Sequence, residues 1–219
     1  MIITIDGPAG SGKSSVAKTL AEKLNIYYLN TGLLYRAVAY IWLKKDPNLE
    51  KIDKIQEKDL FFTEKIEYKY INNIPNIFYD YKNITNYLSN NRISHAASIL
   101  SAKKEVRGKL LELQGIVAQN YDIVAEGRDC GSVIFPNADH KFYLTANLDV
   151  RAKRIFQDKV RDNSGLSLKK VKEELEQRDE RDMNRDVAPL KIPEDAIIID
   201  NSDMDQKHTI LCFLSRIKQ

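Results

Sequence analysis

The sequence has little cysteine, little net charge and no long apolar run. Cys130 and Cys212 are its only two cysteines, so neither a disulfide framework nor a cysteine-rich metal site is expected. The N-terminal stretch "MIITIDG" lacks the basic and apolar regions of a signal peptide. No apolar stretch approaches the ~20 residues that a membrane helix needs. We therefore expect a cytoplasmic protein that has no membrane partner.

The small net charge limits the class of partner. The chain carries a formal charge of +3 and has a pI near 8.6, which is too mild a basic excess to indicate a nucleic-acid partner. It does suit a protein that handles small anions. At 219 residues and 25.2 kDa the chain is long enough for one well-buried core, with room for insertions.

The strongest motif lies at the N-terminus, where "IITIDGPAGSGKSS" reads as a buried strand, a glycine-rich loop and the start of a helix. The loop fits the pattern G-x-x-x-x-G-K-[ST], and this context separates it from a chance glycine turn. Lys13 can reach the β and γ phosphates of a triphosphate, and the Ser14 hydroxyl can bind Mg²⁺. The residues expected to bind ATP are Gly7, Pro8, Ala9, Gly10, Ser11, Gly12, Lys13, Ser14 and Ser15.

Short apolar runs alternate with helical stretches along the rest of the chain. The runs at 121–129, 140–146 and 196–200 join the N-terminal one, which predicts an α/β fold with a central parallel sheet flanked by helices on both faces. Functional side chains should gather where the strands end, as Glu126, Arg128 and Asp129 do.

Two segments depart from this alternation. Residues 60–87 hold eight of the nineteen aromatic residues and read as a small antiparallel insert. Their side chains could form its core or, less commonly, a stacking surface for single-stranded nucleic acid. Residues 151–185 are rich in both charges and read either as a lid over phosphates or as an exposed helical hairpin.

The stretch "RDERDMNRDVAPL" ends that second segment. On a helix its three arginines would share one face, and three aspartates would share the neighbouring face. These are Arg178, Arg181 and Arg185, and Asp179, Asp182 and Asp186. The run is either a solvated surface or a site for an arriving anion, because the like pair at 181 and 185 is unfavourable without one.

Taken together, the motifs closely resemble bacterial cytidylate kinases of the nucleoside-monophosphate kinase family. The resemblance rests on "IDGPAGSGKSS", "NTGLLYRAVA", "NRISHAASILSAKKEVRGKL", "VAEGRDCGSVIFPNADHKFYL" and "RDERDMNRDVAPL". It implies a single three-layer P-loop kinase domain: a core at 1–31, 116–150 and 186–219, a monophosphate-binding segment at 32–115, and a helical lid at 151–185.

The resemblance also implies roles for individual residues. Thr31, Arg36, Arg128 and Arg185 match positions that hold the acceptor phosphate, and Arg178 and Asp182 match positions near its sugar. Ser98, Arg107 and Asp129 match positions that read the base. Cytosine offers an amino donor at N4 and acceptors at N3 and O2, so a carboxylate and an arginine suit its edge. The alternatives for Asp129 are a helix cap or an ion pair with Arg128, and Ser98 could simply be a small packing residue.

The implied reaction transfers the γ-phosphoryl group of ATP to CMP or dCMP by alignment and charge neutralisation. The expected catalytic residues are Lys13, which would hold the donor phosphates, and Arg36, Arg128 and Arg185, which would hold the acceptor phosphate. Mg²⁺ would lie at Ser14, with Glu126 near the ion or its waters. Arg151, Arg154 and Arg161 are candidates for the donor nucleotide.

Other functions remain open at this point. The same fold could serve a kinase of UMP, shikimate or dephospho-coenzyme A, or a nucleotide-driven binding or switch protein. A monomer is expected. We also expect Arg185→Ala to lose far more turnover than Asp179→Ala.

Overall fold

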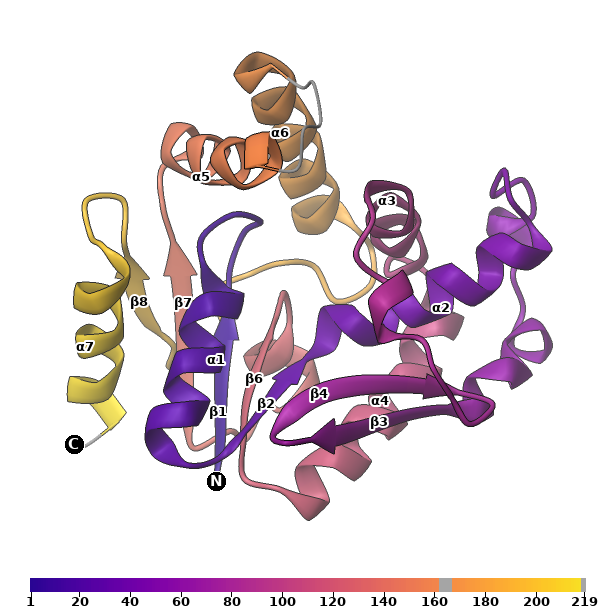
Figure 1. Cartoon of the computed structure of the whole chain (residues 1–219), viewed down its shortest axis with the longest axis horizontal. Helices are drawn as coiled ribbons and strands as arrows, with labels where there is room; N and C mark the ends of the chain where they lie inside the picture. Colours follow the sequence, from indigo (N-terminus) through magenta and orange to yellow (C-terminus); the bar gives the residue numbers. More distant parts are fainter. Residues whose placement is uncertain (162–166, 218–219) are drawn as a thin grey trace. The chain divides into compact units, whose positions relative to one another are not determined.

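The structure is a computed structural model, and it describes residues 1–161 and 167–217, without the side chains of 159–161. The chain divides into two compact units, one formed by 1–26 and 124–219, and the other by 27–123. Each is described by itself below. Five strands form a parallel sheet in the order β2-β6-β1-β7-β8, flanked by helices, and three more form a small antiparallel sheet (Figure 1). The fold predicted from the sequence is therefore confirmed.

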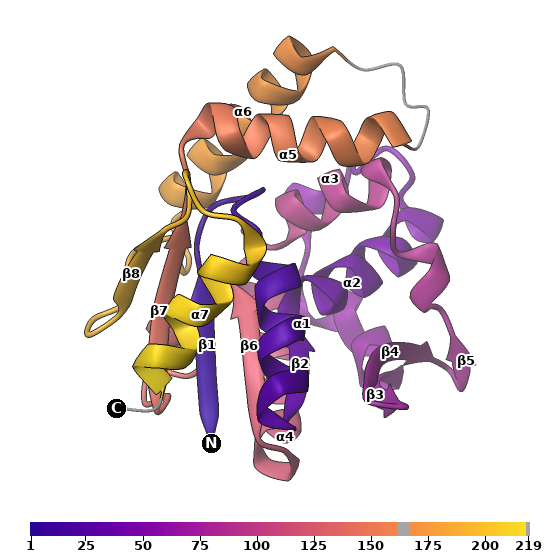
Figure 2. The same cartoon turned by 60° about the vertical axis from the view of Figure 1, so that its left-hand side comes forward.

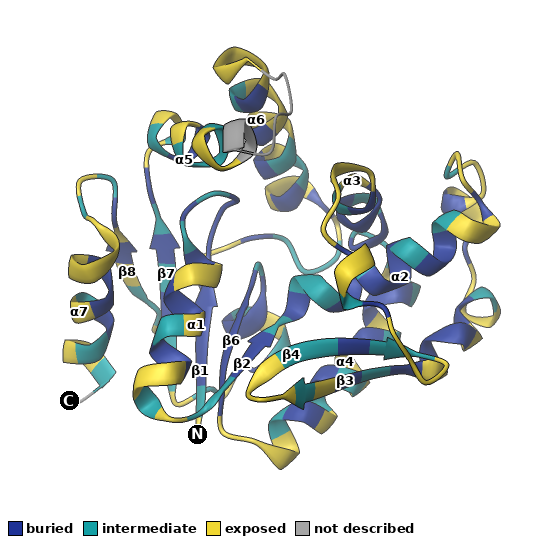
Figure 3. Ribbon diagram, viewed as in Figure 1, coloured by how far each residue is buried: buried dark blue, intermediate teal, exposed yellow. Residues whose placement is uncertain are grey.

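The first unit contains the strands that carry the N-terminal motif and the end of the chain. Its strands are β1 (Ile2–Asp6), β6 (Ile123–Gly127), β7 (His140–Thr145) and β8 (Ile197–Asp200). β1 and β6 are almost wholly buried (Figure 3), as expected of parallel strands covered on both faces. Helices α1 (Lys13–Leu24) and α7 (Gln206–Ile217) pack side by side along the sheet (Figure 2).

The loop between β1 and α1 depends on glycine at its first position. Gly7 has φ 147°, and a Cβ added there would lie 2.0 Å from the backbone oxygen of Leu144. The loop therefore passes too close to β7 for any side chain at this point. Gly12, at φ 92°, is the N-cap of α1, so the helix starts directly at Lys13.

The charged segment predicted as a lid forms two helices, α5 (Leu148–Arg161) and α6 (Leu168–Asn184). The Ser167 side chain caps α6 by accepting a hydrogen bond from Lys170 N–H at 3.3 Å. Gly165 lies outside the described residues. α6 ends one residue earlier than the spacing of the arginines predicts, because Arg185 is extended (ψ 141°). Arg185 is thus a C-cap residue and lies at the end of the helix.

The second unit holds the predicted antiparallel insert. It contains β2 (Tyr27–Asn30), α2 (Thr31–Lys45), α3 (Asn91–Leu100) and α4 (Lys104–Asn120). β3 (Ile66–Ile71), β4 (Ile74–Tyr79) and β5 (Lys82–Asn83) form the insert. The turn between β3 and β4 has positive φ at both Asn72 and Asn73 (51° and 62°), which asparagine tolerates well.

Several of the insert's aromatic side chains pack inside this unit. The Tyr68 hydroxyl accepts a hydrogen bond from Asn30 N–H at 2.9 Å and lies 3.3 Å from Tyr28 O. The ring of Tyr70 lies 4.5 Å from that of Tyr27 and 5.1 Å from that of Tyr121. Burial raises the Tyr70 pKa above its ordinary value. At these positions the aromatic residues form a core, as the first of the two interpretations expected.

The sequence did not predict β2. Its four residues, "YYLN", are too few to show a period of two or of 3.6. Among the described residues, none of the helices combines the length and apolar character needed to span a bilayer.

Candidate functional site

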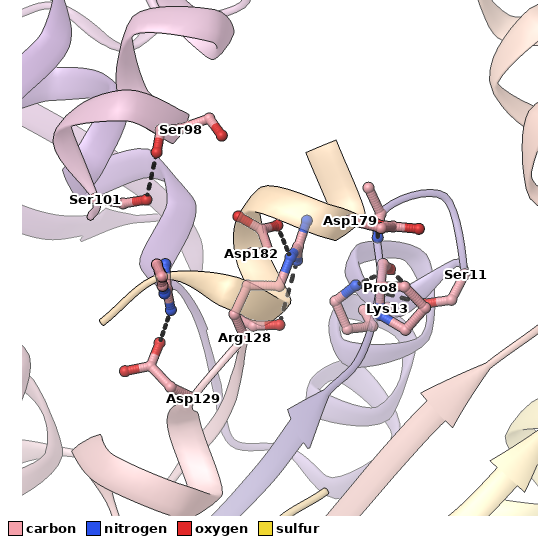
Figure 4. A network of polar contacts seen from close by, with 12 residues as sticks. Pro8, Ser11, Lys13, Ser98, Ser101, Arg128, Asp129, Asp179 and Asp182 are labelled. Atoms are coloured by element: carbon pink, nitrogen blue, oxygen red, sulfur yellow. Dashed lines mark hydrogen bonds and ion pairs between the residues drawn. The ribbon is translucent and has the colours of Figure 1, made fainter. Parts of the chain in front are cut away.

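Lys13 of the phosphate-binding loop is buried and folded back onto its own loop. Its Nζ donates to Pro8 O at 2.6 Å and lies 3.4 Å from Ser11 Oγ (Figure 4). Burial, with the nearby guanidinium of Arg128, lowers the pKa of the Lys13 ammonium to about 7, against the pull of the Glu126 carboxylate. A phosphate beside Lys13 would favour the charged form.

Ser14 and Glu126, the two residues that the sequence analysis associated with Mg²⁺, contact one another. The Ser14 hydroxyl donates to Glu126 Oε1 at 2.8 Å, joining the first turn of α1 to the end of β6. Hydroxyl and carboxylate oxygens are the kind of ligand that Mg²⁺ takes, usually alongside water and phosphate oxygens. The two residues therefore fit a magnesium ion held partly by a bound nucleotide.

Arg128, just after β6, is held by a carboxylate from α6. Its Nε donates to Asp182 Oδ2 at 2.8 Å, and Nη1 lies 3.3 Å from Gly127 O (Figure 4). Burial opposes the charge on Arg128, but Asp182 outweighs this effect and raises the Arg128 pKa. Burial likewise acts against the charged form of Asp182, but Arg128 and Arg178 hold its pKa below the usual value. The pair orients the planar guanidinium fork that suits a phosphate.

A second buried pair joins the next residue to the end of α6. Arg185 Nη2 lies 3.3 Å from Asp129 Oδ1, and Arg185 Nε donates to Ala188 O at 2.7 Å. Asp129 precedes a short π-helical turn (Cys130–Ile134) without capping it through its side chain. The structure thus places Asp129 against Arg185, and neither sequence alternative, a cap or a pair with Arg128, describes this contact.

The charge run on α6 is not a uniform solvated surface. Asp179 and Asp182 are buried, while Asp186 is exposed beyond the helix end. Arg178 is half-buried, and its charge acts on both Lys13 and Asp182. A fully solvated helix face therefore does not describe this stretch, and the alternative, a site for an arriving anion, stays a prediction.

Asp6 is a buried carboxylate that the sequence analysis did not single out. It ends β1, and its two oxygens accept hydrogen bonds from Cys130 N–H and Gly131 N–H, both at 2.7 Å. Burial raises the pKa of Asp6 to about 6, despite these two hydrogen bonds. Asp6 therefore fixes the turn that directly follows Arg128 and Asp129.

Asn201 is a second residue that the sequence analysis did not single out, and it contacts both the loop and Arg154. The Asn201 side chain donates to Ser11 O in the loop at 3.1 Å. Arg154 donates to both Asn201 Oδ1 (3.0 Å) and Asn201 O (2.8 Å). Arg154 is thus engaged with the residue that supports the loop, and its direct contact with a nucleotide stays a prediction. The side chain of Arg161 lies outside the described residues.

Asp179 is the third missed residue, and it contacts the loop as well. Its carboxylate accepts from Ala9 N–H at 3.2 Å and pairs with Arg151 of α5. Asp179→Ala is therefore not a neutral control for Arg185→Ala, because Asp179 is one of the charged residues that hold the loop. No local signal distinguishes it from its exposed neighbours in the sequence.

The remaining predicted residues lie in the second unit. Thr31 is buried at the first position of α2, where the Asn30 side chain caps the helix by accepting from Leu33 N–H at 3.3 Å. Arg36 is half-buried one turn further along the same helix. The first turn of a helix presents N–H groups and positive potential, which suits an anion near Thr31.

Ser98 and Arg107 are both buried and lie near the junction of α3 and α4. Arg107 Nη1 donates to Ser101 O at 3.2 Å. Ser101 Oγ in turn donates to Ser98 O at 2.9 Å, as Figure 4 shows. The guanidinium of Arg107 lies 5.5 Å from the ring centroid of Tyr35. An arginine held in this way has a fixed orientation, as a base-reading residue requires.

Comparison with known proteins gives a consistent picture. The model of the family described as "Cytidylate kinase" matches residues 3–219. The chain is 36% identical over 221 residues to the cytidylate kinase of Thermodesulfovibrio yellowstonii, covering 100% of this chain and 98% of that protein. It is 41% identical over 206 residues to the bifunctional pantoate ligase/cytidylate kinase of Prochlorococcus marinus strain AS9601, covering 90% of this chain and 39% of that protein.

Among solved structures, the shikimate kinase of Bacteroides thetaiotaomicron superposes with a TM-score of 0.50 at 16% identity, covering 100% of this chain and 99% of that one. This likeness shows the fold alone. The family is shown by the match over residues 3–219 and by the full-length relative: the chain belongs to the cytidylate kinase family.

Proposed function

We propose that the chain transfers the γ-phosphoryl group of ATP to CMP or dCMP, giving ADP and CDP or dCDP. One observation supports this most directly. A phosphate-binding loop, a Ser14–Glu126 pair and two carboxylate-oriented arginines, Arg128 and Arg185, belong to one compact unit. Such a set offers what phosphoryl transfer needs, namely positioned donors for phosphate oxygens.

The roles of the residues follow from their chemistry. Lys13 and the N–H groups of the loop would bind the donor phosphates, with Ser14 and Glu126 holding Mg²⁺ directly or through water. When bound, Mg²⁺ supplies charge neutralisation at the donor phosphates. Arg128 and Arg185 would hold the acceptor phosphate, together with Thr31 and Arg36. The transfer requires no protein nucleophile, because an acceptor phosphate oxygen attacks the γ phosphorus.

Recognition of cytosine is the finer part of the proposal. Asp129 would accept a hydrogen bond from the N4 amino group, and Arg107 would donate to N3 or O2, with Ser98 nearby. Uracil carries a carbonyl at position 4, which offers Asp129 no donor. A buried polar group left unpaired costs about 1–3 kcal/mol, so discrimination should be useful but incomplete. Asp182 and Arg178 would lie near the sugar.

An acceptor panel tests this function. ADP production is measured with ATP and CMP, dCMP, UMP or shikimate, and without any acceptor. Turnover that requires CMP or dCMP supports the proposal. Hydrolysis of ATP at the same rate without an acceptor would instead indicate a nucleotide-driven switch. Preference for shikimate or UMP would indicate a kinase with another acceptor.

A further inference from the structure

Ala9, in the middle of the phosphate-binding loop, is held on both sides by one ion pair. Its N–H donates to Asp179 Oδ1 at 3.2 Å, and its carbonyl oxygen accepts from Arg151 Nη1 at 3.0 Å. The same Arg151 Nη1 donates to Asp179 Oδ2, which closes a ring of hydrogen bonds around this single residue. We call Arg151 and Asp179 the Ala9 clamp.

The clamp is built from two helices that are distant from the loop in the sequence. Arg151 comes from α5 and Asp179 from α6, and both are buried. Arg151 is fixed again by donating from Nε to Ala146 O at 2.8 Å, just beyond β7. The apolar residues around it also link the loop to both helices: Ala9, Leu148, Ala152, Ile155 and Leu175.

The position of the clamp gives it more than a stabilising role. A buried ion pair adds little net stability compared with apolar side chains of the same size, so stability alone is a weak reason for it. Both polar groups of the Ala9 backbone are fixed, which sets the orientation of the next peptide and its Gly10 N–H. Phosphate binding by such a loop depends on successive N–H groups pointing the same way.

The neighbouring residue shows how tightly α5 and the loop are coupled. Gly10 has φ 75°, and a Cβ there would lie 3.1 Å from Arg151 O and 2.9 Å from Ile155 Cδ1. A shift of Arg151 would therefore change the surroundings of both Ala9 and Gly10. Misplacement of a positioning group by ~1 Å can cost on the order of 100-fold in rate.

We infer that Arg151 and Asp179 are positioning residues for the donor nucleotide, acting through the Ala9 peptide and not by touching its phosphates. The inference rests on the proposed function only in requiring that the loop bind a nucleotide. It gives Arg151 a different role from the direct contact expected from the sequence. It also assigns a role to Asp179, which the resemblance left without one.

The decisive variant is Asp179→Asn, which keeps the size of the side chain but replaces one acceptor oxygen with an amide donor, so that either Ala9 N–H or Arg151 loses its acceptor. We expect its dissociation constant for Mg·ADP, measured by calorimetric titration, to rise about 10- to 100-fold. The dissociation constant for CMP should rise much less, because Asp179 contacts the loop directly but affects the acceptor residue Arg128 through its charge. Glu180→Gln removes one charge at the next, exposed position and should change neither value.

A second variant keeps the test valid if Asp179→Asn is unfolded. Arg151→Met combined with Asp179→Leu replaces the pair by apolar side chains in an apolar neighbourhood, and circular dichroism would show whether it folds. It should keep a melting temperature near that of the wild type yet lose Mg·ADP affinity to a similar extent. Arg151→Lys, which keeps the charge and one donor, should lose less.

The result that overturns the inference is a folded Asp179→Asn or double variant with wild-type affinity for Mg·ADP. An equal loss of CMP and Mg·ADP affinity would also overturn it, since that pattern indicates a general structural effect. Because these titrations need no phosphoryl transfer, they are independent of the acceptor panel. A chain that binds Mg·ADP but does not phosphorylate CMP would refute the proposed function and leave this test intact.

Discussion

At the scale of single residues, the two arginines that follow β6 and end α6 are held by acids and not by solvent. Asp182 binds Arg128 and Asp129 binds Arg185, so each guanidinium has a defined direction before any ligand arrives. Fixing a long side chain in advance lowers the entropic cost of binding. These two residues should therefore be more sensitive to substitution than the exposed charges beside them.

Arg185→Ala should lower kcat/KM for CMP about 100- to 1,000-fold, as loss of one donor positioned for charge in the transition state typically does. Asp186→Asn is the matched control, because Asp186 is the next residue and is exposed. Steady-state assays with CMP varied at saturating ATP would measure both. A loss for Arg185→Ala no larger than that of the control would contradict its placement at the acceptor phosphate.

Asp129→Asn should change the preference for CMP over UMP more than it changes the turnover of CMP. The Asn amide can donate to the carbonyl at position 4 of uracil, whereas a carboxylate cannot. We expect the ratio of kcat/KM for CMP over UMP to fall by roughly 5- to 150-fold, which corresponds to about 1–3 kcal/mol. Competition assays with both nucleotides would give this ratio directly. An unchanged ratio would remove Asp129 from base recognition.

At the scale of secondary-structure elements, β1 connects two parts of the site. Asp6 at its end binds the turn after Arg128 and Asp129, while Gly7 begins the phosphate-binding loop. One strand end thus sets the position of the loop and of the segment that carries two predicted acceptor residues. The charges around Asp6 are those of Asp129 and Lys13.

The raised pKa of Asp6 predicts a specific pH dependence of stability. Asp6 titrates near 6 when folded and near 3.8 when unfolded, so the folded state binds the extra proton between these values. Its contribution to the free energy of unfolding is therefore largest at low pH and falls as pH rises through about 6. Asp6→Asn removes that contribution.

The free energy of unfolding of the wild type minus that of Asp6→Asn is the quantity to compare at two pH values. This difference should be about 1 kcal/mol larger near pH 5 than near pH 7. Urea denaturation at the two pH values measures this difference. Titrations of groups that do not interact with Asp6 cancel between the two proteins, so the difference reports Asp6 together with its effect on Lys13 and Asp129. A difference in the free energy of unfolding that stays constant, or that grows toward pH 7, would contradict the account.

Two glycines of the loop should respond differently to alanine. A Cβ at position 12 would lie 3.8 Å from its nearest neighbour, Asn201 Nδ2, so Gly12→Ala fits sterically. Its cost comes mainly from the positive φ of 92° and should be about 1–3 kcal/mol of stability. Gly7→Ala would place a Cβ 2.0 Å from Leu144 O, so the loop or β7 must move. We expect the larger loss of thermal stability for Gly7→Ala in a melting experiment. Equal losses would show that this close approach does not constrain the fold.

At the scale of the whole molecule, the sequence predicted what short-range patterns encode. The strand, loop and helix at 1–24 follow from one motif. The antiparallel insert at 66–83 follows from alternating aromatics and a turn. In each case the pattern lies within a few residues.

The sequence did not predict contacts whose partner is backbone far along the chain. Asp6 reaches residues 130 and 131, Asp179 reaches Ala9, and Asn201 reaches Ser11. A polar side chain that binds distant backbone leaves no periodic signal, and it looks like any surface residue. The end of α6 before Arg185 was missed for a related reason, since Asn184 and Arg185 carry no strong helix-stop signal.

The most direct measurement for the whole account follows the transferred group itself. The wild-type protein is incubated with Mg²⁺, CMP and ATP labelled at its γ phosphorus, and the products are separated. The account predicts that the label appears in CDP, that it does so only when CMP is present, and that Lys13→Ala abolishes it. Label released as orthophosphate at the same rate with or without CMP would contradict it.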